Sequence, residues 1–177
     1  MSNYITSNFS NLIFSCSVPS QWHMEHRVPD HCVVFVRQGK LLISDKGRTE
    51  EIPAGSCVFL KKDCSVRLVK ASFAGKNYEG LNIRLPQNIL EDYFQRHLKN
   101  NEFPQDFTGL SNCFMRLNRT LCLQGLLSSI ILFVEEGQDP GQEMTELKVE
   151  ELILDLLQTN IRFFPTLFDF YRDWNVD

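Results

Sequence analysis

The stretch that decides the fold is residues 32–60, which read CVVFVRQGKLLISDKGRTEEIPAGSCVFL. Short runs rich in β-branched and aromatic residues alternate there with the turn-forming residues Gly39, Gly47 and Pro53-Ala54-Gly55. Strands of this length, separated by tight turns at close spacing, are typical of an antiparallel sandwich or a small barrel.

The strand pattern continues on both sides of this stretch. Further strands are predicted over residues 11–17, 64–69 and 78–85. Together with the central stretch they predict a β-barrel over residues 1–85.

The second half of the chain changes to helical spacing at Pro86, a residue that fits the first turn of a helix. Apolar residues recur every three or four positions over residues 86–98, 117–136 and 143–158. We therefore expect an α+β protein, with an N-terminal antiparallel barrel and three to four α-helices in residues 86–177.

Composition limits the function. The 177 residues carry 22 acidic and 18 basic side chains, for a net charge of −4. The basic residues are scattered, so no surface for neutralising DNA phosphates is predicted in this chain. No apolar run approaches transmembrane length, and residues 1–16 lack the pattern of a secretory signal. A cytoplasmic protein is expected.

Cysteine usage points the same way. None of the six cysteines forms a C-x-x-C pair, and several lie inside apolar runs, as Cys32 and Cys57 do. We expect all of them to be reduced thiols that pack as small apolar side chains.

The glycine pattern resembles the cupin family. Gly47, five further residues and Pro53-Ala54-Gly55 reproduce part of the second cupin motif, and Gly39 resembles the end of the first. The resemblance therefore implies a cupin-like jelly roll.

The metal ligands of cupin enzymes are mostly missing from the matching positions. Val58 stands where the second motif has histidine, and Cys32 stands at the carboxylate position of the first motif. The two histidine positions of that motif fall on His26 and Val28. One histidine and one cysteine do not make a catalytic metal site, so no metal, no cofactor and no catalytic residue are predicted. The local cluster of His23, His26 and His31 has poor ligand spacing for a strand.

A barrel without metal ligands that is followed by amphipathic helices resembles the N-terminal domain of AraC-family transcription regulators. The run from Leu147 to Leu154 resembles the helix that follows the barrel in the ExsA-like branch. The Val33–Leu42 hairpin and the Pro53-Ala54-Gly55 turn stand in the same order, and the resemblance covers roughly residues 30–160. It implies a regulatory and dimerisation domain, with DNA contacted only through a C-terminal helix-turn-helix domain that this chain lacks.

The resemblance leaves alternatives open. The chain is either an excised domain or a natural stand-alone protein. A metal-dependent cupin enzyme or isomerase, and a stand-alone protein-interaction domain, are the competing functions. The aromatic tail packs either on the chain's own helices or on another domain; it comprises Phe163, Phe164, Phe168, Phe170, Tyr171 and Trp174.

Two sets of candidate site residues follow. Alternation along the strands predicts a mainly apolar pocket for a small-molecule effector, unless the barrel is filled by its own side chains or the input is a regulatory protein. The pocket candidates are His26, Cys32, Val34, Val36, Val58 and Leu60. The two long apolar helices predict a homodimer, unless they are simply core. The interface candidates are Leu123, Leu127, Ile130, Val149, Leu152, Ile153 and Leu156.

Overall fold

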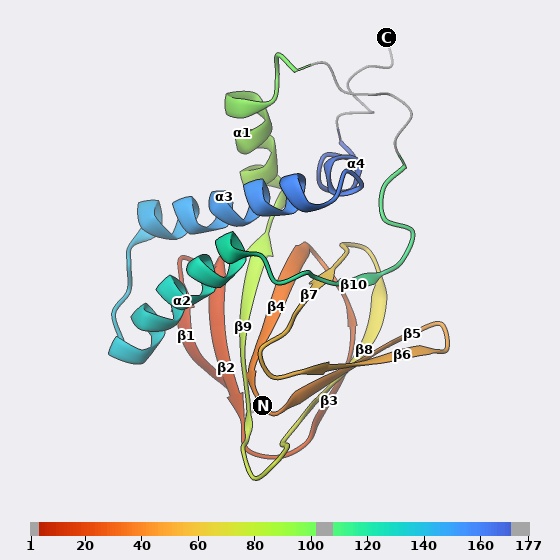
Figure 1. Ribbon diagram of the computed structural model, residues 1–177, viewed down its shortest axis with the longest axis vertical. Helices are drawn as coiled ribbons and strands as arrows, with labels where there is room; N and C mark the ends of the chain where they lie inside the picture. The colour runs from red at the N-terminus through yellow and green to blue at the C-terminus, as the bar shows by residue number, and fades with distance from the viewer. Residues whose placement is uncertain (1–3, 102–107, 171–177) are drawn as a thin grey trace.

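Residues 4–101 and 108–170 are described by the structure, a computed structural model. Two antiparallel sheets enclose a common interior, and helices cover the outer face of the larger one (Figure 1). The larger sheet contains, in spatial order, β1 (Ile5–Phe9), β2 (Ile13–Val18), β9 (Tyr78–Leu85), β4 (His31–Gln38), β7 (Cys57–Leu60) and β10 (Phe114–Arg116). The smaller sheet contains β3 (Trp22–Arg27), β8 (Ser65–Ala71), β5 (Lys40–Asp45) and β6 (Arg48–Pro53).

This strand order is that of a double-sheet jelly roll. From β2 to β9 the chain alternates between the two sheets, apart from the β5–β6 hairpin. The predicted α+β fold with an antiparallel jelly roll is confirmed. Among the described residues no ladder joins the two sheets, so the barrel is a pair of facing sheets and not a continuous cylinder.

The helices follow the jelly roll in the second half of the chain. They are α1 (Gln87–His97), α2 (Leu121–Glu136), α3 (Gln142–Thr159) and α4 (Phe163–Leu167). The start of α2 was predicted four residues too early, because β10 ends at Arg116 and residues 117–120 form the connection that leads into the helix. Thr120 then caps α2 by accepting a hydrogen bond from the backbone N–H of Leu123 at 2.9 Å.

Three strands were not predicted: β1, β3 and β10. The last of these lies within the half expected to be helical and pairs with β7, with Phe114 opposite Leu60. The second half of the chain therefore supplies one of the two edge strands of the larger sheet. The division into domains at residue 85 stays a prediction.

Strand alternation gives the larger sheet two different faces. On β4, Val34 and Val36 face the jelly-roll interior, whereas Val33 belongs to the cluster packed under the helices. On β7, likewise, Val58 faces the jelly-roll interior and Phe59 faces the helices. Because both faces are buried, the central strands read as nearly continuous apolar runs.

Ion pairs fasten the helices to the sheet and to each other. Arg37 on β4 lies 2.7 Å from the carboxylate of Glu135 on α2. Arg96 on α1 pairs with Asp92 one turn earlier and with Glu150 on α3.

The tight turn between β4 and β5 requires a glycine. Gly39 has φ +71°, and a Cβ atom there would lie 2.5 Å from the carbonyl oxygen of Ala71. A residue with a side chain would be both strained and blocked at this position.

Candidate functional site

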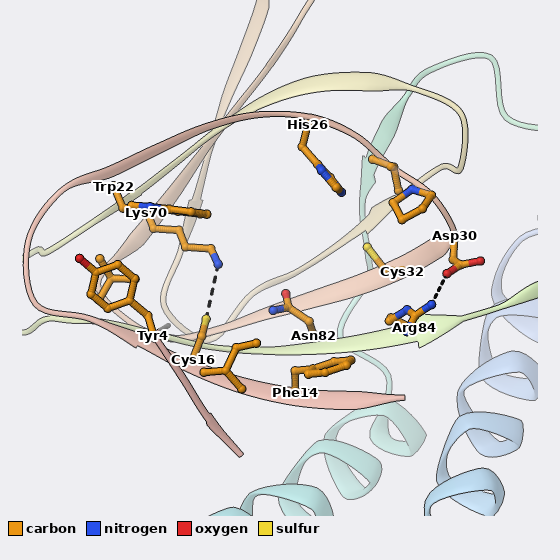
Figure 2. A pocket seen from close by; sticks show the side chains of 14 residues that line it. Tyr4, Phe14, Cys16, Trp22, His26, Asp30, Cys32, Lys70, Asn82 and Arg84 are labelled. Atoms are coloured by element: carbon orange, nitrogen blue, oxygen red, sulfur yellow. Dashed lines mark hydrogen bonds and ion pairs between the residues drawn. The ribbon is translucent and has the colours of Figure 1, made fainter. Parts of the chain in front are cut away.

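A cavity of about 870 Å³ lies inside the jelly roll, between the β1–β2–β9–β4 side of the larger sheet and strands β3 and β8 (Figure 2). A volume of this size is ordinary for a small-molecule site. Its walls are mainly apolar and aromatic, formed by Tyr4, Ile5, Phe14, Val18, Trp22, Val28 and Pro29. The polar lining side chains are Cys16, His26, Asp30, Cys32, Lys70, Asn82 and Arg84.

Lys70 provides a buried positive charge at one end of the cavity. It is only 9% exposed, and its Nζ atom donates a hydrogen bond to the Cys16 sulfur at 3.5 Å. The same nitrogen lies 5.0 Å from the ring centre of Trp22 and 5.5 Å from that of Tyr78. Cation–π contacts stabilise the ammonium group in part.

No carboxylate neutralises this charge within the described part of the chain, where Lys70 forms no ion pair. Burial removes the water that would solvate the ammonium group, and contacts with aromatic rings and a thiol do not fully compensate for that loss. The Lys70 end of the cavity is therefore suited to an anionic group.

The other end of the cavity holds a charge pair that is already balanced. Arg84 lies 2.5 Å from the carboxylate of Asp30 and also donates to the carbonyl oxygen of Asn11 at 2.9 Å. In Figure 2 the Asp30–Arg84 pair and Lys70 lie at opposite ends of the cavity, with Asn82 between them. Burial, and to a lesser degree the charge of Asp30, raises the pKa of the Cys32 thiol to about 12, so this side chain is neutral.

The structure divides the predicted pocket residues into two groups. His26 and Cys32 line the cavity. Val34, Val36, Val58 and Leu60 point into the same interior but lie in its packed core. The jelly roll is thus filled by its own side chains on one side and hollow on the other.

The three clustered histidines separate. On β3, His26 is directed toward the cavity, while His23, three residues earlier, is exposed. His31, at the start of β4, is 1% exposed and stacks on Phe59 with ring centres 5.5 Å apart. No group of three potential metal ligands occurs among the residues that the structure describes.

His31 is neutral because of its surroundings. Its Nδ1 atom accepts a hydrogen bond from the backbone N–H of Lys62 at 3.0 Å. Burial, followed by the positive charge of Lys62, lowers the pKa of His31 to about 4.

The predicted interface residues all lie in the core of a single chain, between α2, α3 and the larger sheet. Each of Leu123, Leu127, Ile130, Val149, Leu152, Ile153 and Leu156 is at most 6% exposed. These side chains pack inside the chain, so a partner would have to contact other residues.

Other apolar side chains of α2 and α3 remain exposed. On α3 they form a stripe of Met144, Leu147 and Leu154, which are 41%, 57% and 47% exposed and recur at helical spacing. On α2, Leu121 and Leu132 are 85% and 61% exposed. Helical periodicity marked both faces of these helices as apolar without showing which face is covered.

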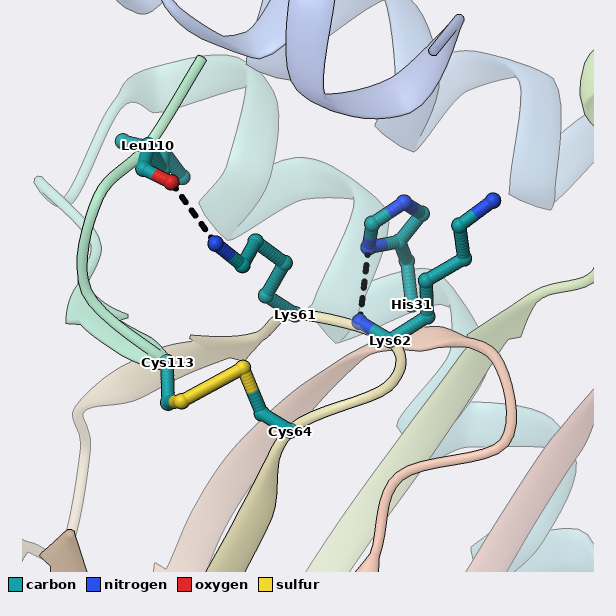
Figure 3. Close-up of a disulfide and its surroundings, with 6 residues drawn as sticks. All are labelled: His31, Lys61, Lys62, Cys64, Leu110 and Cys113. Carbon is teal, nitrogen blue, oxygen red and sulfur yellow. Dashed lines mark hydrogen bonds between the residues drawn. A yellow bond between two sulfur atoms is a disulfide. The ribbon is translucent and has the colours of Figure 1, made fainter. Parts of the chain in front are cut away.

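The expectation of reduced thiols was wrong at one pair. Cys64, just before β8, and Cys113, just before β10, form a disulfide with their Cα atoms 5.6 Å apart (Figure 3). The pair is 49 residues apart in sequence, which is why spacing gave no sign of it. Cys16, Cys32, Cys57 and Cys122 are unpaired.

Lys70 was also missed. By strand alternation Lys70 lies on the same face of β8 as Val66 and Leu68. A lysine at a position where the pattern expects a buried apolar residue was the sign that could have identified it.

Of the aromatic tail, Phe163 and Phe168 are buried against the chain's own α1 and β7 residues. Tyr171 and Trp174 lie outside the described residues. Among the described helices, none has the length and apolar character needed to cross a membrane.

Comparison with known proteins gives a family. The model of the ExsA N-terminal regulatory domain matches residues 31–163. No curated protein sequence matches the chain.

The solved structures with similar folds include several of ToxT from Vibrio cholerae. An apo variant of ToxT superposes with a TM-score of 0.60 at 14% identity, over 86% of this chain and 58% of that one. Wild-type ToxT with a bound unsaturated fatty acid gives a TM-score of 0.56 at 13% identity, over 81% of this chain and 52% of that one. ToxT bound to (E)-4-(8-methylnaphthalen-1-yl)but-3-enoic acid gives 0.51 at 13% identity, over 81% and 56%. The chain thus spans little more than half the length of these ToxT chains.

Proposed function

The chain belongs to the ExsA N-terminal regulatory domain family, and from this premise we propose that its cavity receives an effector and that its helices transmit the response. The chain is the regulatory domain of an AraC-type transcription regulator. DNA contact would be made by another segment of the whole regulator, in the cytoplasm.

The observation that carries the proposal is Lys70, a buried ammonium group that faces a largely apolar cavity. The effector it favours has an anionic head, such as a carboxylate, on an apolar body. The head would accept hydrogen bonds from Lys70, and the body would contact Phe14 and Trp22. The two ToxT ligands, a fatty acid and a naphthalenyl butenoic acid, are both carboxylic acids of this shape.

The expected contribution of Lys70 follows from its burial. A hydrogen bond between charged partners contributes about 2 kcal/mol net, and 1.4 kcal/mol corresponds to roughly tenfold in affinity. Replacing Lys70 with methionine keeps an unbranched apolar side chain as far as Cε but removes the charged amine. The affinity for an anionic amphiphile should fall about 30-fold.

The experiment is isothermal titration calorimetry of the whole chain with three ten-carbon probes: decanoate, decanol and decylammonium. Wild-type protein should bind decanoate most tightly, and Lys70→Met should lose that preference. Lys99→Met, which removes an exposed lysine, is the matched control and should bind as wild type does. Equal affinity for decylammonium, unchanged decanoate binding by Lys70→Met, or no binding of decanoate to wild type would each refute the proposed effector class.

The response is proposed to involve a homodimer that pairs the exposed stripe Met144, Leu147 and Leu154 with its copy. Exposed apolar side chains that recur along one side of a helix favour a contact, and a two-fold arrangement is the commonest one. Such pairing would place two DNA-binding segments side by side on two half-sites.

Sedimentation velocity tests this pairing. The double variant Leu147→Glu/Leu154→Glu should sediment as a monomer and still unfold cooperatively, because neither side chain belongs to the core. Ile161→Glu, at an exposed apolar position outside the helices, serves as the control and should remain dimeric. A monomeric wild type, or a dimeric double variant, would show that this stripe is not the interface.

A further inference from the structure

The turn between β7 and β8 is tied to the segment that precedes β10 by several bonds. The disulfide joins Cys64 to Cys113, with a Cα separation in the usual range for such bonds. Lys61 adds two hydrogen bonds. Its backbone N–H donates to the carbonyl oxygen of Cys113 at 2.8 Å. Its Nζ donates to the carbonyl oxygen of Leu110 at 2.8 Å, as Figure 3 shows. The disulfide is the covalent member of this set.

The same segment also supports α4. The backbone N–H of Leu110 donates to the Thr166 hydroxyl at 2.8 Å, and Thr166 is only 6% exposed. On the other side of the turn, Lys62 forms an ion pair with Asp169 at 2.9 Å. The β7–β8 turn is therefore in contact with the segment before β10 and, through Asp169, with the residues just after α4.

We infer that Cys64 and Cys113 form a reversible redox site, closed by an oxidant of the small-molecule disulfide class, which fixes the segment before β10 and with it α4. This inference concerns a site separate from the effector cavity.

The chemistry is thiol–disulfide exchange in two steps. The thiolate of one cysteine attacks a sulfur of the oxidant, which gives a mixed disulfide and releases one small thiol. The second cysteine then attacks the protein-bound sulfur and releases the second small thiol, so the chain loses two hydrogens. Excess small thiol reverses both steps.

The other cysteines are placed unfavourably for this reaction. Cys16 is only 6% exposed, and its sulfur accepts a hydrogen bond from Lys70. Burial raises the pKa of both the Cys32 and the Cys57 thiols to about 12, so they lack the thiolate that attacks a disulfide. Cys122 is exposed on α2 but has no partner cysteine in the described part of the chain.

The closed site should stabilise the domain measurably. A bond that closes a loop of 49 residues restricts the unfolded chain, and the corresponding rise in melting temperature for a domain of this size is about 10 °C. The local effect should be confined to residues 108–116 and 163–170.

The test compares the whole chain equilibrated with reduced and with oxidised glutathione. Three readouts apply: the intact mass, which falls by about 2 Da on closure; peptide mapping of the bond; and hydrogen exchange of the two segments. Oxidation should produce the Cys64–Cys113 peptide, raise the melting temperature and slow exchange in both segments. Cys113→Ser should match reduced wild type under either condition, and Cys122→Ser should behave as wild type.

Each contrary result removes a defined part of the inference. If oxidised glutathione yields no Cys64–Cys113 peptide, or if excess reduced glutathione does not open the bond, there is no reversible site. If the bond forms while exchange in residues 163–170 stays unchanged, α4 is not coupled to it. Wild-type protein alone decides both points, so the result does not depend on how well a serine variant folds.

Discussion

Leu152 and Leu154 lie within one turn of α3, but Leu152 is a core residue and Leu154 is a surface residue. Leu152 is completely buried among the side chains that join α3 to the larger sheet, while Leu154 is 47% exposed. The sequence pattern assigned Leu152 to a dimer interface. The structure predicts instead that its truncation weakens the fold of each chain.

The magnitude follows from burial. Shortening a fully buried leucine to alanine removes apolar contacts and leaves a cavity, which costs about 2–5 kcal/mol. With about 3 kcal/mol as the middle value, the melting temperature of a domain of this size should fall by roughly 6–12 °C. Leu154→Ala should lower the free energy of unfolding by only about 0.5 kcal/mol, because half of that side chain already contacts water.

Urea unfolding, followed by circular dichroism, gives the free energy of unfolding of both variants. The slope m of each variant is compared with that of wild type, since an unchanged m shows that the same unfolding transition is measured. Measurement over a range of protein concentrations separates loss of folding from loss of dimer. The packing described here is refuted if Leu152→Ala costs less than about 1 kcal/mol, or if Leu154→Ala costs as much as Leu152→Ala.

Three further predictions concern stability. Burial lowers the pKa of His31 to about 4, so as pH falls below 6.5 the unfolded chain takes up a proton on this side chain before the folded chain does. The free energy of unfolding should therefore drop between pH 6.5 and 4. Urea titrations at each pH should show a smaller drop for His31→Asn. Gly39→Ala should destabilise far more than Gly47→Ala in thermal melts, since both have positive φ but only Gly39 faces a backbone atom at 2.5 Å. Thr120→Ala should cost about 1–2 kcal/mol by loss of the α2 cap, and Thr120→Ser should restore most of it.

The jelly roll and the helices could be predicted because their patterns are local. Buried strands such as β4 and β7 are apolar runs bounded by Gly39 and Pro53-Ala54-Gly55, and both features can be recognised in sequence. The strand β3 escaped notice because it is only six residues long and its half-buried side is not uniformly apolar, since the polar His26 follows Trp22 and Met24 on that side. The strand β10 is three residues long, too short to show any period.

The site could be predicted only in part, because it depends on contacts between distant segments. The cupin resemblance selected His26, and strand alternation placed Cys32 on the same face as Val34 and Val36, but neither showed which part of the interior is hollow. Sequence alone could not show that the charge of Lys70 is isolated, because its neighbours come from distant segments: Cys16, for example, is 54 positions away. For the same reason the sequence did not show that the seven interface candidates on α2 and α3 are buried within the chain: periodicity identifies an apolar face but not what covers it.

Strand β10 has a consequence for biosynthesis. Until Arg116 leaves the ribosome, the edge of β7 exposes unpaired backbone groups, and a growing polypeptide with such an edge is open to pairing with its neighbours. The first 85 residues emerge well before this protection arrives. A shortened fragment ending at residue 85 would keep that open edge permanently, and would form aggregates where the longer chain does not.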